Sequence, residues 1–191
     1  MTTICSAEEL SYSIDGKQIL NCQSFVLKNG DFFEIRGKNG SGKSTLLKIL
    51  CRVIDNSSLQ TTKDFKKNLS YLGHKNAFVE ELTMQENFNL DNLKCDISLA
   101  KLLNIQNLID EYCLNLSFGE KRKFAIMRVF QSNKRYWILD EPFASLDKDS
   151  CDAINQQFIS HIETGGLVVI TNNQDSVCLL YTSDAADDEE R

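Results

Sequence analysis

The sequence predicts an α/β fold with a mainly parallel sheet, and three observations point to it. Segments of strand and helical character alternate along most of the 191 residues. Three strand-like runs are mostly apolar, as in strands covered on both faces, and they occupy residues 32–36, 136–140 and 167–171. A glycine-rich turn links the first of these runs to a helical stretch. Alternation of this kind is typical of parallel strands joined by crossover helices.

The first thirty residues predict an antiparallel β-hairpin. SYSI and QILNCQSFVL flank a DGK turn, and Asn29-Gly30 closes the second segment. After the run at 32–36 and the glycine-rich turn, STLLKILCRV predicts a helix over 44–53. A connection rich in lysine and asparagine, NSSLQTTKDFKKN, then leads to a short strand at 69–72.

The middle of the chain departs from this alternation. Residues 83–112 have helical character, clearest in ISLAKLLNIQNLIDEY, and a further helix is predicted over 117–131. We place the stretch of about 76–131 in a helical subdomain, inserted into a single domain that spans residues 1–177. YWILD, a helix around DAINQQFISHI and the strand GLVVIT complete the readable pattern.

The C-terminal residues do not continue the pattern. CLLYTSDAADDEER favours neither strand nor helix and resembles a translated sequencing adapter. We therefore treat the native sequence as truncated near Ser176 or Val177, and expect residues 178–191 to be non-native or disordered. From Tyr181 onward the tail carries −4 of the formal net charge of −6. The rest of the chain is nearly neutral, which gives no general argument for nucleic-acid binding.

Composition argues against several classes of protein. No apolar run approaches the roughly 18 residues that a membrane span needs, and no export leader follows Met1. If the protein works at a membrane, we expect it to dock onto a partner there. The seven cysteines form no C-x-x-C pair, which favours buried thiols in a reducing cytoplasm over zinc ligands or disulfides. Two histidines are too few for a histidine-rich metal site.

The segment GKNGSGKST fits the pattern G-x-x-x-x-G-K-[ST] of a phosphate-binding loop. It lies between a predicted strand and a predicted helix, so its backbone N–H groups can surround phosphates at the positive end of the helix. The pattern implies that its lysine contacts the β- and γ-phosphates and that its first hydroxyl binds Mg²⁺. The alternative is a glycine turn without a ligand. The candidate residues are Gly37, Lys38, Asn39, Gly40, Ser41, Gly42, Lys43, Ser44 and Thr45.

Two carboxylates follow the apolar run YWIL. Asp140 and Glu141 stand at the carboxyl end of this predicted core strand. Asp140 can hold Mg²⁺ through water there, and Glu141 can orient or deprotonate the water that attacks a γ-phosphate. An acid after an apolar strand is by itself a weak signal, often only a strand that ends in a loop. Paired with the phosphate loop, it predicts a nucleotide site with Mg²⁺.

A second set of phosphate-ready groups occurs in LSFGEK, residues 116–121, which we call the signature segment. A phosphate loop alone could belong to a kinase, a GTPase, a helicase or a recombinase. Kinases and GTPases, however, need no LSFGE before a basic helix, followed by WILDEP and SLD. This ordered set resembles the ATP-binding cassette family over residues 4–175. The resemblance implies two cassettes paired head to tail, each ATP lying between the phosphate loop of one and the signature segment of the other.

The resemblance also assigns roles to individual residues. It implies that Ser117, Gly119 and the helix start behind them cap a γ-phosphate held by the partner chain. It implies that Tyr12 stacks on adenine, and the alternative is an ordinary surface tyrosine. Asp147, in ASLD, matches the acid that links the two subunits. His74, in YLGHKNAF, falls where most cassettes have a glutamine that senses Mg²⁺ and the membrane partner; an ordinary surface histidine is the alternative.

Three departures from the family pattern stand out. Phe118 occupies the place of a small residue, which can alter how closely the partner approaches. Glu120 replaces the common glutamine and puts a negative charge near the phosphate. Asn172 and Asn173 stand where a histidine normally contacts the γ-phosphate, and the alignment of TNNQ selects Asn173. Asparagine can hydrogen-bond but carries no charge, so we expect slow ATP hydrolysis with ATP binding retained.

Several segments narrow the resemblance to one group of cassettes. YLGH, ELTMQENF, YWILDEPFASLD and ETGGLVVITNNQ are similar to the ATPase subunit of the haem exporter used in cytochrome c maturation, the CcmA type. The resemblance implies a dimeric ATPase that uses ATP and Mg²⁺ and works with integral membrane subunits. It also implies a cytoplasmic protein, peripheral on the inner face of the inner membrane, that does not itself bind haem.

Two other functions remain open on the sequence. The chain could serve another ABC exporter, for a lipid, a drug or another substrate, and the membrane protein that co-purifies with it would separate these cases. It could instead be a non-transport cassette protein of translation or DNA repair. The sequence shows no heptads and no basic runs of the kind such a protein would need.

Overall fold

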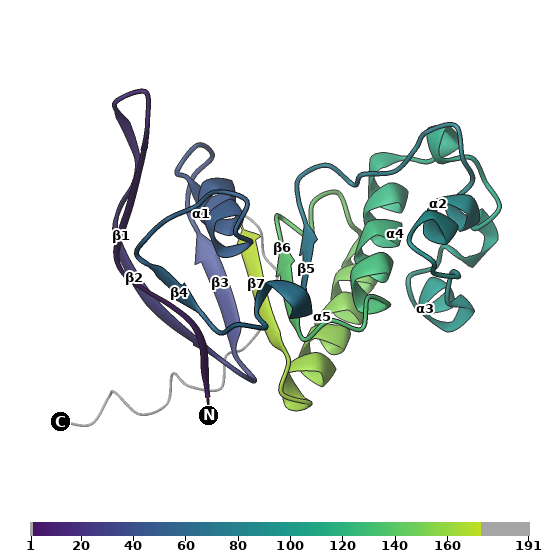
Figure 1. Ribbon diagram of the computed structural model, residues 1–191. Helices are drawn as coiled ribbons and strands as arrows, with labels where there is room; N and C mark the ends of the chain where they lie inside the picture. The colour runs from purple at the N-terminus through teal and green to yellow at the C-terminus, as the bar shows by residue number, and fades with distance from the viewer. Residues whose placement is uncertain (1, 173–191) are drawn as a thin grey trace.

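Two sheets with flanking helices make up the structure, a computed structural model that describes residues 2–172 (Figure 1). Four strands form a parallel sheet in the order β3-β7-β6-β5, and three form an antiparallel sheet in the order β2-β1-β4. The predicted α/β fold, with a parallel sheet and an N-terminal antiparallel hairpin, is therefore confirmed.

The strands are β1 (Thr3–Ile14), β2 (Lys17–Lys28), β3 (Phe32–Arg36), β4 (Leu59–Thr61), β5 (Leu69–Leu72), β6 (Tyr136–Leu139) and β7 (Leu167–Asn172). The helices are α1 (Lys43–Leu50), α2 (Met84–Leu90), α3 (Ile97–Leu102), α4 (Phe118–Phe130) and α5 (Lys148–Glu163). Short 3-10 helices are η1 (Lys66–Asn68), η2 (Gln106–Leu108) and η3 (Cys113–Asn115). Within residues 2–172, none of the helices combines the length and apolar character needed to span a bilayer.

The parallel sheet separates two hydrophobic cores, because side chains along a strand point alternately to its two faces. In β6, Trp137 and Leu139 belong to a buried cluster with residues of α4 and α5. Tyr136 and Ile138 belong instead to a cluster with residues of α1 and the antiparallel sheet. Figure 1 accordingly shows α1 and α4 on opposite sides of β5 and β6.

Two strands differ from the prediction. β3 was expected to be of the buried type, but it lies at the edge of the parallel sheet, so its side chains are only partly covered. β4 was not predicted at all. Its three residues lie in the polar connection after α1, and they become a strand only by pairing with Cys5, Ser6 and Ala7 of β1.

The stretch predicted to be helical over 83–112 is broken into short helices. α2 starts at a cap formed by Thr83, and both α2 and α3 are followed by left-handed residues. These are Asn92 (φ 58°) and Asn104 (φ 56°), and a left-handed residue ends an α-helix. ISLAKLLNIQNLIDEY is therefore α-helical only over its first six residues. These helix ends depend on left-handed backbone conformations, which the spacing of apolar residues does not predict.

The carboxyl ends of the four parallel strands meet at one edge of the sheet, as in other open α/β folds, where ligands bind at this edge. β3 leads there into the glycine-rich loop 37–42, and β5 into the loop that carries His74. β6 leads into Asp140 and Glu141. The fold thus gathers three of the predicted motifs along one edge.

Candidate functional site

The loop between β3 and α1 depends on glycine for its shape. Gly40 and Gly42 have φ values of 79° and 92°. A Cβ on Gly42 would lie 2.8 Å from Leu20 Cδ2 and 2.9 Å from the Ile19 carbonyl oxygen, so the hairpin packs directly on the loop. Gly42 is also the N-cap of α1 and provides no side-chain hydrogen bond to the helix. The first N–H groups of α1 therefore face the loop without a side-chain cap.

Lys43 is folded back over this loop. Its side chain is buried, and its ammonium group donates hydrogen bonds to the carbonyl oxygens of Gly37 (2.7 Å) and Lys38 (3.2 Å). These partners are neutral carbonyls. A phosphate oxygen would form a stronger, charge-assisted contact with the same ammonium group. The geometry therefore suits an anion held between the loop and α1.

Asp140 and Glu141 are fixed by one hydroxyl from the neighbouring strand. The Thr171 hydroxyl donates to Asp140 Oδ1 at 2.6 Å, and the Glu141 N–H donates to the Thr171 oxygen at 2.8 Å. Asp140 is only 2% exposed, whereas Glu141 is partly exposed. Glu141 also has a left-handed backbone, with φ of 49°. For a residue other than glycine this conformation is strained, and such strain is common at functional sites.

Arg122 joins this edge of the sheet to α4, a role that sequence analysis missed. Its side chain is 1% exposed. It donates to the carbonyl oxygens of Gly73 (2.9 Å), Glu141 (3.1 Å) and Asp140, and to Asn76 Oδ1 (3.1 Å). Burial lowers the pKa of Arg122 to about 10. Because Arg122 lies in the run KRK, the sequence indicated only a basic helix.

His74 and Tyr12 lie beside this edge. His74 is exposed on the loop after β5, next to Gly73, which Arg122 contacts. Tyr12 is partly buried on β1 and pairs across the hairpin with Leu20, the residue that packs against the phosphate loop. Asn173, predicted to replace the histidine that contacts the γ-phosphate, lies outside the described residues. Its neighbour Asn172 donates from Nδ2 to Glu34 Oε1 at 2.8 Å.

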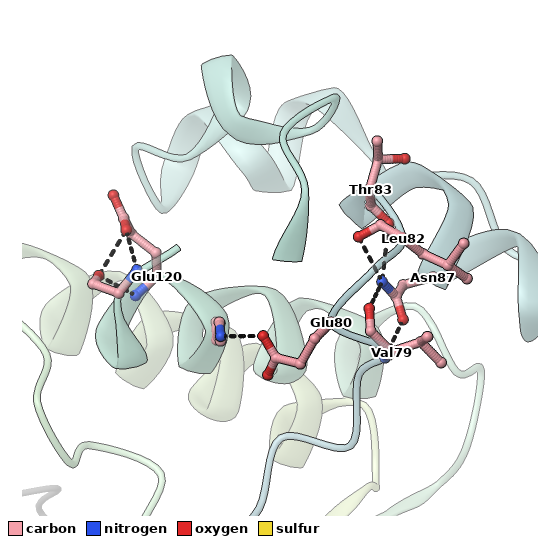
Figure 2. Close-up of polar contacts among 8 residues, drawn as sticks. Val79, Glu80, Leu82, Thr83, Asn87 and Glu120 are labelled. Carbon is pink, nitrogen blue, oxygen red and sulfur yellow. Dashed lines mark hydrogen bonds and ion pairs between the residues drawn. The ribbon is translucent and has the colours of Figure 1, made fainter. Parts of the chain in front are cut away.

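The signature segment forms the start of α4. Ser117 is the N-cap, and its hydroxyl accepts from the Glu120 N–H at 3.3 Å. The Glu120 carboxylate in turn accepts from the Ser117 N–H (2.8 Å) and hydroxyl (2.6 Å), as Figure 2 shows for Glu120. These hydrogen bonds hold the pKa of Glu120 below its usual value. Gly119 is needed for packing, because a Cβ there would lie 2.6 Å from the Ser145 carbonyl oxygen.

Asp147 connects α4 to α5. Its Oδ1 caps α5 by accepting from the Ser150 N–H at 2.8 Å, and its Oδ2 pairs with Lys123 Nζ at 2.7 Å. The hydrogen bond from Lys123 is the main cause of a pKa well below the usual range for this carboxyl. Asp147 therefore lies beside the signature segment of its own chain.

The predicted residues fall into two groups on opposite faces of the sheet. The phosphate loop belongs to α1, whose buried side chains share a core with the antiparallel sheet. The signature segment belongs to α4, whose buried side chains lie in the other core. Arg122 links the second group to the carboxylate edge. Within residues 2–172, no three His, Cys, Asp or Glu side chains gather in a way that could hold a metal ion.

Comparison with known proteins decides the family. The sequence matches the family described as ABC transporter over residues 20–144. The chain belongs to the ABC transporter family. The cytochrome c biogenesis ATP-binding export protein CcmA of Shewanella frigidimarina (strain NCIMB 400) is 33% identical over 189 residues, covering 90% of this chain and 87% of that protein. The CcmA protein of Colwellia psychrerythraea (strain 34H / ATCC BAA-681) is 34% identical over 194 residues, covering 93% and 89%.

A solved structure agrees at the level of the fold. The ATP-binding subunit of an ABC transporter superposes with a TM-score of 0.76 at 21% identity, covering 89% of this chain and 80% of that one. The family match and the relatives support an ABC ATPase of the CcmA type. Membership of the family implies that the chain binds nucleotide.

Proposed function

We propose that the chain is the ATP-hydrolysing subunit of the haem exporter used in cytochrome c maturation, and that two copies close head to tail over two ATP molecules. The observation that carries the proposal is the placement of two phosphate-ready helix starts on opposite faces of one sheet. One chain cannot apply both to the same nucleotide. A head-to-tail pair can, because α4 of one copy then faces the phosphate loop of the other.

In this proposal the loop 37–45 holds the ATP phosphates, and Lys43 exchanges its loop carbonyls for phosphate oxygens. Tyr12 stacks on the adenine ring beside the loop. The Ser44 hydroxyl and the Asp140 carboxylate fit Mg²⁺, which prefers oxygen ligands and retains several waters. When bound, Mg²⁺ neutralises charge that develops on the phosphates.

The partner copy completes each site. Ser117, the Gly119 N–H and the start of α4 contact the γ-phosphate held by the other chain, with Glu120 close to it. Asp147, paired with Lys123 just after the signature segment, lies where two copies would meet. The pair therefore forms only when a triphosphate supplies contacts to both copies, and ATP binding shifts the population from open to closed.

Hydrolysis depends on the carboxylate edge. Glu141 orients or deprotonates the attacking water, and Thr171 and Arg122 hold the Glu141 peptide in place. His74 and Asn173 are proposed to contact the γ-phosphate side of the site. Because asparagine carries no charge, turnover is proposed to be slow.

Several features support work at a membrane. ATP-binding subunits of this family act with membrane subunits, and the relatives are named as export proteins of cytochrome c biogenesis. We place the chain in the cytoplasm, peripheral on the inner face of the inner membrane, with residues 1–177 as one cassette and about 76–131 as its helical subdomain. It has no role for nucleic acid and no direct contact with haem. The membrane proteins that co-purify with it decide between haem and another cargo.

The Glu141→Gln variant tests the head-to-tail pair. Glutamine keeps the size of the side chain but cannot take a proton, so ATP should bind and remain uncleaved. We expect the variant to elute from a sizing column as a dimer with ATP and Mg²⁺, and as a monomer with ADP. Asp149→Asn, an exposed acid in the first turn of α5, is the control and should behave as the wild type. A variant that stays monomeric with ATP and Mg²⁺ would refute the proposal.

A further inference from the structure

Ser117, which in the proposed function meets a partner's phosphate, is engaged within its own chain. Both donors of Ser117, its N–H and its hydroxyl, point to one oxygen of the Glu120 carboxylate at 2.8 and 2.6 Å. The Ser117 oxygen accepts from the Glu120 N–H at 3.3 Å. Glu120 thus occupies, with a negative charge, the position at the start of α4 that an anion would take.

Neighbouring cations relieve this charge less than Ser117 does: the hydrogen bonds from Ser117 are the largest cause of the lowered pKa of Glu120, and the attraction of Lys123 is a smaller one. Both nearby lysines are paired with other carboxylates. Lys121 Nζ lies 2.7 Å from Glu80 Oε2, and Lys123 Nζ lies 2.7 Å from Asp147 Oδ2. Figure 2 shows Glu120 at the start of α4 and Glu80 reaching the same helix further along. The Ser117 hydroxyl and N–H are therefore the main partners of the Glu120 carboxylate.

The chain contains the same arrangement at a second helix, away from the signature segment. At the start of α2, the Glu86 carboxylate accepts from the Thr83 N–H (2.8 Å) and hydroxyl (2.9 Å), and the Glu86 N–H donates to Thr83 Oγ1 at 3.2 Å. In both places the carboxylate stabilises a helix start. Only at α4 does the proposed function place a phosphate against the same donors, so the two caps form a matched pair.

We propose that Glu120 is an internal competitor of the partner-bound γ-phosphate, and that it sets the ATP concentration at which two copies close. The inference rests on the proposed function. For the pair to close, the carboxylate must leave the Ser117 donors, or share them with a phosphate that repels it. The open chain is thereby stabilised and the closed pair destabilised by the same residue.

Glu120→Gln separates charge from shape. Glutamine still accepts from Ser117, because the capping arrangement works with either Glu or Gln, but it does not repel phosphate. In the Glu141→Gln background, a titration of ATP with Mg²⁺ on a sizing column or by sedimentation gives the ATP concentration at half-dimerisation. We expect Glu120→Gln to lower this concentration about fivefold, the effect of one charge near a helix end. Glu86→Gln should leave it unchanged.

The outcomes are distinguishable. If the Glu141→Gln protein itself fails to dimerise with ATP and Mg²⁺, the proposed function is wrong. If it dimerises but Glu120→Gln needs as much ATP or more, Glu120 is not a competitor. The inference also fails if Glu86→Gln gives the same gain, since the effect would then come from any weakened cap. Thermal melting of both glutamine variants shows that each remains folded.

Discussion

The starts of α1 and α4 are built in opposite ways. α1 begins at Gly42, whose left-handed backbone gives the helix no side-chain cap, and a lysine lies across the loop in front of it. α4 begins at Ser117, where a side-chain cap and a returning carboxylate use the hydroxyl and two N–H groups. One helix start is open and the other is closed by its own chain.

The difference follows from where each ligand would come from. A nucleotide held by the chain itself needs backbone N–H groups that are already exposed to it, and glycine provides them without a competing side chain. A phosphate that arrives on a second copy meets α4 only part of the time. Between such encounters a capped start keeps the helix stable. In our proposal, the open start of α1 therefore serves the affinity for ATP, and the closed start of α4 sets the ATP concentration at which two copies pair.

The largest expected effect comes from the open end. Lys43→Ala removes the ammonium group that bridges the loop and, in our proposal, the β- and γ-phosphates. Loss of a hydrogen bond to a charged group costs about 1.5–3 kcal/mol, so the Kd for ATP should rise roughly 10- to 100-fold. Equilibrium binding of a fluorescent ATP analogue measures this change.

Lys48→Ala is the matched control, because Lys48 is an exposed lysine in the last turn of the same helix. Its Kd should match that of the wild type. An unchanged Kd in Lys43→Ala would mean that the phosphates bind elsewhere. The difference between the starts of α1 and α4 would then say nothing about ATP binding.

The two ends also differ in how far the sequence predicted them. The phosphate loop is local: its glycines, its lysine and the following helix are adjacent in the chain, so nine residues define it. Asp140 and Glu141 follow the same logic at the end of a strand. The contacts that position them come from Thr171 and Arg122, which are distant in sequence. No periodicity or motif reports a hydrogen bond between residues so far apart.

The cap at α4 lay between these cases. Ser117 and Glu120 are three residues apart, which is the spacing of a capping box. The family resemblance assigned these residues to phosphate binding, so the capping box was not predicted. The broken helices over 83–112 were missed for another reason. Asn92 and Asn104 end them through left-handed backbone, and apolar spacing is insensitive to that.

A smaller effect is expected where α4 meets the carboxylate edge. Arg122→Lys keeps the charge but cannot reach all four acceptors on Gly73, Asn76, Asp140 and Glu141. The Glu141 peptide then loses one of its two anchors. We expect kcat for ATP hydrolysis to fall about tenfold while KM stays within about twofold, the pattern of an interaction needed in the transition state. Steady-state ATPase measurements with thermal melting test this.

Arg128→Lys separates positioning from stability. Arg128 lies on the same helix and donates to the carbonyl oxygens of Ala77 (3.3 Å) and Asn76 (3.2 Å), but the structure records no hydrogen bond from it to Asp140 or Glu141. We expect the Arg128→Lys variant to have a lower melting temperature and an unchanged kcat. Equal losses of kcat in both variants would mean that Arg122 acts only by stabilising the fold.

The smallest expected effect concerns an ion pair that helps to hold the start of α4 in place. Lys121 pairs with Glu80. Asn87 holds the segment around Glu80 in place, because it accepts from the Val79 N–H (2.8 Å) and donates to the Val79 and Thr83 carbonyls (3.0 Å each), as Figure 2 shows. Because Glu80 is half exposed, water and salt screen the pair. A double-mutant cycle of Lys121→Gln and Glu80→Gln should give a coupling free energy of unfolding below about 1 kcal/mol. Denaturant unfolding at low and high salt measures it. A coupling above about 2 kcal/mol that persists in high salt would show that this ion pair holds α4 as well as its cap. Removing the Glu120 charge would then affect the stability of the start of α4 less than the comparison with α1 implies.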